Sequence, residues 1–415
     1  MALTDDARPP ALLPFVRANA PFLGAGFLLA FGSTYGQTVF IALFAAQIMA
    51  AFELTDGGWG LIYALATTSS ALAMVWAGAL ADRMRIRTLA LIVTGGLALA
   101  CLGMAAAQGA LTLALAIFAL RLLGQGMSSH LSNLAMARWF RRSRGRALAI
   151  ASTGFAVGQA ALPILFVSLL AVVDWRLLWM GAAALTLLSM PVVRRLLRAE
   201  RTPQSLAADP QAAGMAGRHW TRGAVLRHWL FWALVPMLLA PPVFGTALLF
   251  HQVHLVEQKG WALIDYVALF PLLTASTVLA TFASGAALDR FGAGRMLQIY
   301  LVPFTAAFAL MGAAETLAGA AVALMVFGLG AGMQATVPTA FWAEFYGTRH
   351  LGAIKALAAA LMVAGTALGP GLTGALIDRG IPFPAQMPWI AFACLLAGAL
   401  AAGAVARVRR LSATA

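Results

Sequence analysis

Apolar segments separated by short polar connections follow one another along the whole chain. Most are rich in glycine and alanine, and each is long enough for a helix to cross a bilayer, which takes ~20 residues. A helix satisfies its own backbone hydrogen bonds in lipid. The pattern therefore predicts an all-α membrane protein with twelve transmembrane helices. Their expected positions are residues 19–46, 58–81, 88–107, 111–137, 146–171, 175–197, 228–256, 262–288, 295–313, 316–343, 351–377 and 387–407.

One long connection, residues 198–227, interrupts the regular spacing. It predicts an N-terminal six-helix bundle at 1–197, a cytoplasmic linker, and a C-terminal six-helix bundle at 228–415. Short motifs recur at matching places in the two halves, namely Gly58-Trp59 with Gly260-Trp261 and Gly124-Gln-Gly126-Met127 with Gly330-Ala-Gly332-Met333. Duplicated halves with a site between them are a common architecture of secondary transporters. We therefore expect two pseudo-symmetric bundles.

Composition agrees with a membrane location. The chain is 62% hydrophobic and only 10% charged, whereas ~25% of residues are charged in soluble domains. The net charge of +14 would suit nucleic-acid binding, but 24 of the 28 basic residues lie at connections on one side of the predicted bilayer. This asymmetry follows the positive-inside rule. It predicts a multi-pass protein of the cytoplasmic (inner) membrane with both termini cytoplasmic and with no nucleic-acid partner.

Arg121 is a full charge near the middle of the fourth segment. A guanidinium keeps its proton at ordinary pH, so at this depth it must face protein or water. Gln125, Ser128 and Ser132 follow at helical spacing on the same side. Arg121 could contact an anionic or polar substrate, or set the potential for proton transfer. The alternative is a structural arginine that donates to backbone carbonyls of the first or fifth segment.

Other polar side chains inside the segments are few. No aspartate or glutamate lies in the central part of any segment, so a carboxylate proton relay is not expected. Histidine could replace it, and His251 and His254 lie one turn apart in the outer third of the seventh segment, where a solvated rim is the alternative. Single polar residues that could contact substrate, or bond to a neighbouring helix, are Tyr35, Gln37, Gln159 and Gln334.

A duplicated loop signature follows the second and eighth segments. Its two copies are Gly78, Asp82, Arg83 and Arg87, and Gly285, Asp289 and Arg290. With Arg121 five residues before Gly126, these motifs resemble the major facilitator superfamily over all twelve segments. The resemblance implies rocking of two bundles in alternating access. It also implies that Asp82 and Asp289 close the inner face, each near a helix N-terminus of the other half. The alternative role is local solvation beside the neighbouring arginines.

The connection at residues 138–148, RWFRRSRGRAL, resembles the branch of monocarboxylate and oxalate/formate carriers. Those carriers have a cationic side chain in the eighth segment, and the present segment, 262–288, has none. The resemblance therefore covers the loop but departs at that position.

We predict a secondary active transporter of a small organic anion or polar metabolite, with a co-transported proton as a further partner and a monomer as the working unit. The chain has no Gly-rich phosphate-binding loop with a lysine and no converging catalytic set. We therefore expect no enzyme activity and no cofactor or metal. The alternatives are an exporter of amphipathic compounds or drugs, and a non-transporting sensor with the same fold.

Overall fold

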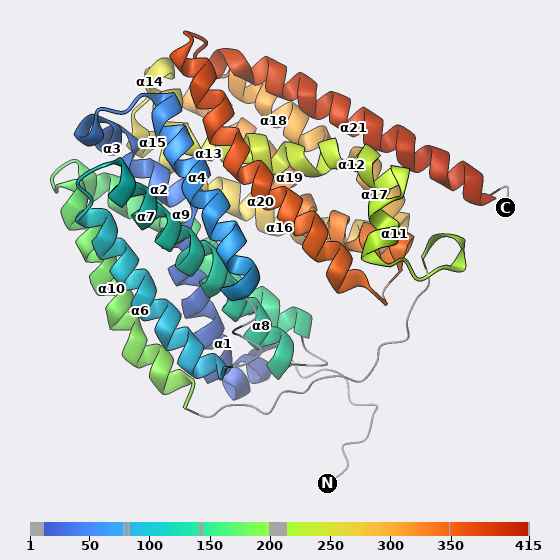
Figure 1. The fold of residues 1–415 in the computed structure, drawn as a ribbon, viewed down its shortest axis with the longest axis horizontal. Helices are drawn as coiled ribbons and strands as arrows, with labels where there is room; N and C mark the ends of the chain where they lie inside the picture. The colour runs from blue at the N-terminus through green and yellow to red at the C-terminus, as the bar shows by residue number, and fades with distance from the viewer. Residues whose placement is uncertain are drawn as a thin grey trace. The chain divides into compact units, whose positions relative to one another are not determined.

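The computed structural model describes residues 12–77, 80, 84–140, 144–198, 214–347 and 349–413. Every regular element in these residues is a helix, which confirms the predicted all-α class (Figure 1). The described part of the chain divides into two compact units. The first falls within Met1–Phe40, Ser69–Leu162 and Leu169–Ala207, and the second within Ile41–Thr68, Pro163–Ser168 and Ala208–Ala415. Part of the N-terminal half thus belongs to the second unit.

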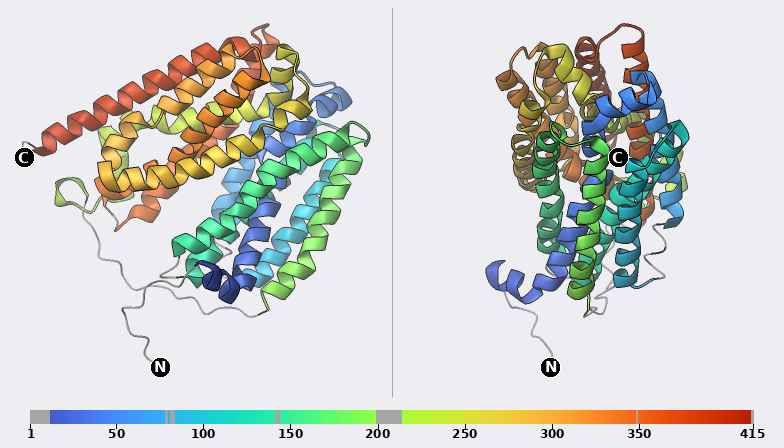
Figure 2. Two further views of the ribbon diagram at one scale, coloured as in Figure 1. Left: turned by 180° about the vertical axis from the view of Figure 1, so that it is seen from behind. Right: turned by 90° about the vertical axis from the view of Figure 1, so that its left-hand side faces the viewer.

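The helices of the first unit include long spanning helices and short irregular turns. They are α1 (Leu12–Gly32), the 3₁₀ turn η1 (Ser33–Gly36), the second half of α4 (Asp56–Ala77), α6 (Ile86–Ala105), α7 (Ala110–Leu120), the π-helical η3 (Arg121–Ser128), α8 (Ser129–Trp139), most of α9 (Arg144–Leu170) and α10 (Trp175–Leu196). Helices α6 and α10 run side by side along much of their length (Figure 2).

The second unit contains all helices that follow the long connection. They are η4 (Met215–Gly217), α11 (Arg222–Leu226), α12 (Trp229–Ala240), the π-helical η5 (Pro241–Gly245), α13 (Thr246–Phe250), α14 (Gln252–Lys259), α15 (Leu263–Val267), α16 (Phe270–Phe291), α17 (Ala293–Ile299), α18 (Val302–Ala313), α19 (Leu317–Tyr346), α20 (Leu351–Asp378) and α21 (Phe383–Ala413). It also contains η2 (Ala42–Phe44), α3 (Ala45–Phe52) and the first half of α4 (Asp56–Ala77).

Eleven helices of the described residues are long and apolar enough to cross a membrane. A bent pair, Thr38–Phe52 with Asp56–Met74, raises the count to twelve if the pair is one span. Large apolar side chains stay exposed on these helices, for example Leu188 at 68%, Leu279 at 69% and Trp389 at 74%. Such surfaces suit lipid and not water.

The structure differs from the expectation at the first segment, predicted as one helix over 19–46. Helix α1 ends at Gly32, and the 3₁₀ turn η1 and the short α2 (Thr38–Ile41) follow it. The break lies where Gly36 packs directly against the fourth segment: a Cβ added to Gly36 would lie 2.7 Å from the backbone nitrogen of Gln125. Close backbone approach of this kind requires glycine, and apolar periodicity alone does not reveal it.

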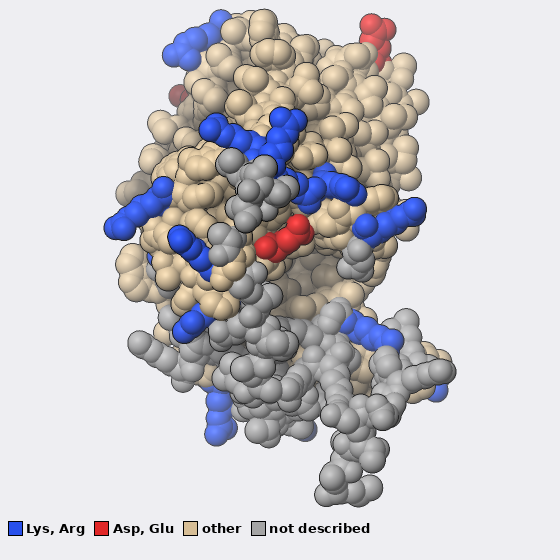
Figure 3. Space-filling model, turned by 90° about the vertical axis from the view of Figure 1, so that its right-hand side faces the viewer, with Lys and Arg blue, Asp and Glu red and all other residues tan. Residues whose placement is uncertain are grey.

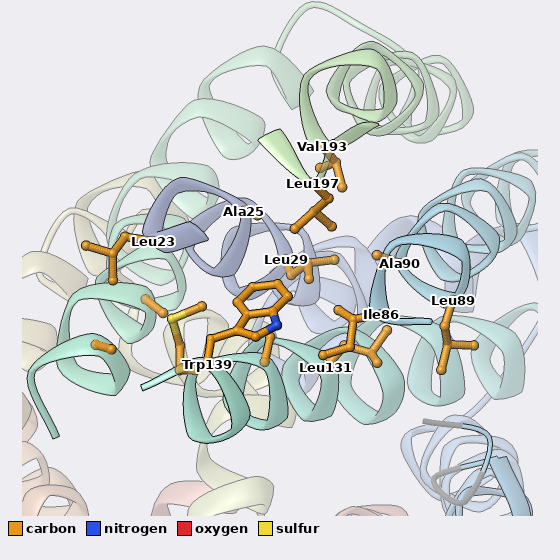
Figure 4. Packing of buried hydrophobic residues seen from close by; sticks show 14 of the residues in the cluster. Leu23, Ala25, Leu29, Ile86, Leu89, Ala90, Leu131, Trp139, Val193 and Leu197 are labelled. Atoms are coloured by element: carbon orange, nitrogen blue, oxygen red, sulfur yellow. The ribbon is translucent and has the colours of Figure 1, made fainter. Parts of the chain in front are cut away.

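The core of the first unit joins α1, α6, α8 and α10 (Figure 4). Leu29 of α1, Ile86 of α6, Leu131 of α8 and Leu197, which caps the end of α10, are all nearly inaccessible. Trp139, the last residue of α8, packs in the same cluster. This packing fixes the spanning helices that carry Arg121 and its neighbours.

The two ends of the second unit differ in charge. Basic residues gather where α12 and α17 begin and α16 and α21 end, and blue atoms predominate over red on this face in Figure 3. The exposed basic side chains there are Arg222, Arg227, Arg290, Arg295 and Arg407. The guanidinium of Arg407 lies 5.4 Å from the ring centre of Trp229. The opposite end carries Glu257, Asp265, Glu315 and Asp378. The charge asymmetry read from the sequence is thus present within one unit.

Candidate functional site

Arg121 is buried in the first unit, where 4% of its surface is exposed. Its Nη1 donates to the carbonyl oxygen of Gly36 and to Oγ1 of Thr38, each at 3.3 Å. Both acceptors lie at the break in the first segment. The guanidinium therefore donates to a backbone carbonyl and a side-chain hydroxyl at the point where the first segment departs from a regular helix.

The π-helical turn η3 begins at Arg121 and contains Gln125. Inserted π-helical turns inside α-helices often occur at functional sites. Gly124 and Gly36 lie backbone to backbone, since a Cβ on Gly124 would be 2.8 Å from the Cα of Gly36. The contact brings Tyr35 and Gln37, the neighbours of Gly36, against the turn that carries Arg121 and Gln125.

The polar stripe that follows Arg121 faces α1. Ser128 Oγ donates to the carbonyl of Leu29 at 2.9 Å, and Ser132 Oγ donates to the carbonyl of Gly26 at 2.8 Å. These two hydroxyls join neighbouring helices inside the unit. The stripe predicted from helical spacing is thus present, and Ser128 and Ser132 use it to hydrogen-bond to α1.

Among the other predicted contacts in this unit, Tyr35 is buried and its ring meets Phe40 edge-on at 5.3 Å between centres. Gln37 and Gln125 are half-buried. Gln159, also half-buried, directly follows Gly158 of α9, and Gly158 packs against Thr34. The structure therefore gathers Tyr35, Gln37, Arg121 and Gln125 around one break and places Gln159 next to a residue that packs on it.

His251 and Gln334 belong to the second unit. Gln334 is half-buried in α19 and follows Gly332, which packs against Ala280 of α16. His251 lies between α13 and α14 and is 2% exposed, so it is not a solvated rim residue. Its Nε2 is 3.1 Å from the carbonyl oxygen of Pro370, and its Nδ1 is 3.6 Å from Oδ1 of Asp56.

Only some of the predicted gating residues lie within the described part of the chain. Gly78, Asp82 and Arg83 lie outside the described residues, and Arg87 is half-buried in α6. Gly285, Asp289 and Arg290 form the last turns of α16, where Arg290 lies over the ring of Phe291 at 5.3 Å.

The turn after the second loop signature is built by residues that sequence reasoning did not assign. Gly292 has φ +77°, a conformation that favours glycine, and it allows the sharp passage from α16 to α17. The Ala293 N–H then donates to Oε2 of Glu344 at 2.8 Å, and Arg409 lies 3.8 Å from Oε1 of the same carboxylate. The Gly-Ala-Gly run at 292–294 was the available signal for this turn.

Sequence reasoning also missed a second cluster at the other end of the second unit, around Asp56. Oδ2 of Asp56 lies 3.6 Å from Nδ1 of His254. Nearby, Asp378 accepts from the Gly57 N–H at 3.1 Å and from Oγ1 of Thr55 at 2.9 Å. Asp56 and Asp378 each lie at one end of an apolar segment, but no pattern in the chain pairs them with residues so distant in sequence.

Comparison with known proteins gives consistent matches. Residues 26–370 match the model of the Major Facilitator Superfamily. Monocarboxylate transporter 13 of Bos taurus is 28% identical over 317 residues, which is 74% of this chain and 71% of that protein.

Solved structures resemble the fold over nearly the whole chain. A bacterial homolog of the human lysosomal transporter Spinster, inward-facing and unoccupied, has a TM-score of 0.61 at 19% identity and covers 95% of both chains. Its occupied form has a TM-score of 0.63 at 18% identity, with 98% of this chain and 96% of that chain covered. At these identities the likeness concerns the fold alone.

Proposed function

We propose that this chain, which belongs to the Major Facilitator Superfamily, carries a small organic anion across the cytoplasmic membrane by alternating access. Membership makes it a multi-pass secondary transporter of a small molecule. The substrate class, the alternating-access mechanism, a co-transported proton and a monomeric working unit are the parts that we propose. We also propose the division into two six-helix bundles, 1–197 and 228–415.

The observation that carries the proposal is the position of Arg121. The central parts of the apolar segments contain this arginine and no aspartate or glutamate. A fixed positive charge in surroundings of low dielectric produces a strong local potential, which attracts an anion. Planar, bidentate recognition of a carboxylate is also the contact for which arginine is suited.

The contacts of Arg121 suggest how binding would be coupled to movement. Its Nη1 holds the Gly36 carbonyl and Thr38 Oγ1 at the break in the first segment. An anion that engages the guanidinium competes with these two neutral acceptors. Binding would then loosen the contact between the first and fourth segments, with Tyr35, Gln37, Gln125 and Gln159 as further polar contacts. We propose Gln334 and His251 as contacts from the second unit.

Relatives support an anion as the substrate. Monocarboxylate transporter 13 is named for monocarboxylates, and we extend that class to this chain as part of the proposal. The eighth segment has no cationic residue, so we assign charge recognition to Arg121.

A thermal-shift screen of the purified protein tests the substrate class. The panel contains organic acids, sugars, amino acids and cationic dyes. We expect organic acids to raise the melting temperature of the wild type and of Arg176→Gln, but not that of Arg121→Gln. Arg176 is the matched control because its Nη1 also donates to backbone carbonyls, those of Ala105 and Ala107. Stabilisation by cationic dyes alone would favour the drug exporter and contradict the anion.

A further inference from the structure

Three titratable side chains meet inside the second unit. Asp56 begins α4, His251 lies between α13 and α14, and His254 lies in the first turn of α14. The side chains of Asp56, His251 and His254 are 20%, 1% and 13% exposed. The cluster joins a segment of the N-terminal half to helices of the C-terminal half, at the end that the charge pattern predicts to be extracellular.

Hydrogen-bond geometry places a proton on His251. A carbonyl oxygen only accepts, so Nε2 must donate to Pro370, 3.1 Å away. Nδ1 faces the Asp56 carboxylate at 3.6 Å, and a carboxylate also only accepts. A second proton on Nδ1 would turn the 3.6 Å contact with Asp56 into an ion pair.

His254 fits the neutral form. Its Nδ1 faces the other carboxylate oxygen of Asp56, while its Nε2 is buried with no hydrogen-bond partner. Burial lowers the pKa of His254, which lies in α14 beyond the end of the spanning segment at Phe250. An added proton on Nδ1 of His251, together with a neutral His254 and an ionised Asp56, would give the cluster a net charge of zero.

Other charged groups near the cluster have roles of their own. Glu257, one turn beyond His254 on α14, partly offsets the lowering of its pKa. Asp378 at the end of α20 accepts from Thr55 and from the Gly57 N–H. Lys259 donates to the Gly312 carbonyl at 2.9 Å. Asp56 is thus the carboxylate that both rings face, and Glu257 acts only on His254.

The helices around the cluster approach each other closely. A Cβ on Gly60 of α4 would lie 2.6 Å from the Pro370 carbonyl oxygen, and one on Gly374 would lie 2.6 Å from the Asp56 carbonyl oxygen. The ring of Trp59 stacks on Phe250 at 5.2 Å between centres, next to His251. Backbone contact of this kind forms only when the start of α4 and the end of α20 meet fully.

We propose that Asp56, His251 and His254 form a proton-binding site that latches the start of α4 to α13, α14 and α20. When the latch opens, water reaches the cluster and solvates the carboxylate and both imidazole rings. When it closes without an added proton, the half-buried Asp56 carboxylate faces two neutral rings, and the cluster has a net charge of −1. Burying an uncompensated charge is unfavourable, so closure of the latch takes up one proton, and lowering the pH from 8 to 7 favours closure. At lower pH His254 opposes closure, because burial lowers its pKa in the closed latch.

A carboxylate and two histidines are also a common metal-ligand set. Within the described residues, however, no group of three or more histidine, cysteine, aspartate or glutamate side chains has the arrangement to hold a metal ion. The two rings face different oxygens of one carboxylate, which suits hydrogen bonding to a shared anion.

The inference rests on the proposed alternating access, and its test uses accessibility without any substrate. Ala64 of α4 faces Gly371 of α20 across the latch. Cys101 and Cys394, both buried, are replaced by alanine, and Ala64→Cys is labelled from outside intact cells with an impermeant methanethiosulfonate. Val172→Cys, at a position that is 81% exposed, gives the reference rate at each pH.

We expect the relative labelling rate of Ala64→Cys to fall between external pH 8 and pH 7, by up to roughly tenfold, which is the limit for uptake of one proton over one pH unit. Adding His251→Gln or Asp56→Asn should remove this pH response. Adding His350→Gln, a histidine outside the cluster, should preserve it. A flat wild-type response, or a response that survives either substitution in the cluster, would overturn the latch. A pH response in a protein that transports no organic anion would support the latch and contradict the proposed substrate class.

Discussion

The Asp56 carboxylate lies 3.6 Å from Nδ1 of His251 and, through its other oxygen, 3.6 Å from Nδ1 of His254. The Asp56 carboxylate thus faces two imidazole rings, which differ in burial and in the contacts of their Nε2 atoms. Nε2 of His251 has the Pro370 carbonyl, and Nε2 of His254 has no partner. The two histidines should therefore respond differently to acid.

We expect His254 to make the folded protein acid-sensitive. Burial lowers its pKa, so as the pH falls through ~6.5 the unfolded chain takes up a proton before the folded chain does. Stability contributed by the neutral ring is complete above that pH and is lost as the pH falls through the lowered folded pKa. Between pH 6.5 and 5 the melting temperature of His254→Gln should decline less than that of the wild type. Equal slopes for the two proteins would contradict this assignment, and His350→Gln should behave like the wild type.

The close approach of Gly36 to the fourth segment predicts a large effect of one methyl group. In Gly36→Ala the new Cβ would lie 2.7 Å from the Gln125 nitrogen and 2.8 Å from the Gly124 Cα. Overpacking of this kind destabilises a protein by about 1–3 kcal/mol. Gly181→Ala in α10 is the control, because its Cβ would meet nothing within 4 Å. We expect Gly36→Ala to lower the melting temperature and Gly181→Ala to leave it unchanged or raise it. The reverse order would be incompatible with the packing described.

Asp82 and Asp289 are predicted to close the inner face. A carboxylate near a helix N-terminus contributes about 0.3–1 kcal/mol, and more when it is partly buried. Neutralising either residue with asparagine should increase thiol accessibility at the inner face and slow transport, while the melting temperature changes little. Asp265→Asn, at the opposite end, serves as the control and should leave transport intact. Unchanged transport in both Asp82→Asn and Asp289→Asn would leave the motif without a gating role.

Orientation in the membrane can be checked independently of transport. Basic residues at one end of the second unit predict that this end is cytoplasmic. A single cysteine at position 315 should react with an impermeant reagent added to intact cells. A cysteine at position 142 should react only after the cells are opened. The opposite labelling pattern would invert the topology and move the latch to the inner face.

Hydrophobic periodicity predicted most of the fold, because a spanning helix is a local property of composition and length. Arg121 and the stripe of Ser128 and Ser132 could likewise be read from one segment. The break at residues 33–36 could not, since it depends on Gly36 meeting Gly124 from a distant part of the chain. For the same reason the sequence placed His251 and His254 one turn apart but did not join them to Asp56. A long-range contact between single polar residues leaves no periodic signal.

Uptake into proteoliposomes tests the central claim, transport of an organic anion through Arg121, most directly. The probe is the radiolabelled organic acid that gives the largest thermal shift, supplied with a pH gradient that is acidic outside. We predict accumulation by the wild type and by Arg176→Gln, enhanced by the gradient, and none above protein-free vesicles with Arg121→Gln. Arg121→Lys should transport weakly, because it keeps the charge and loses the planar fork. Uptake by a folded Arg121→Gln at the wild-type rate would contradict the account.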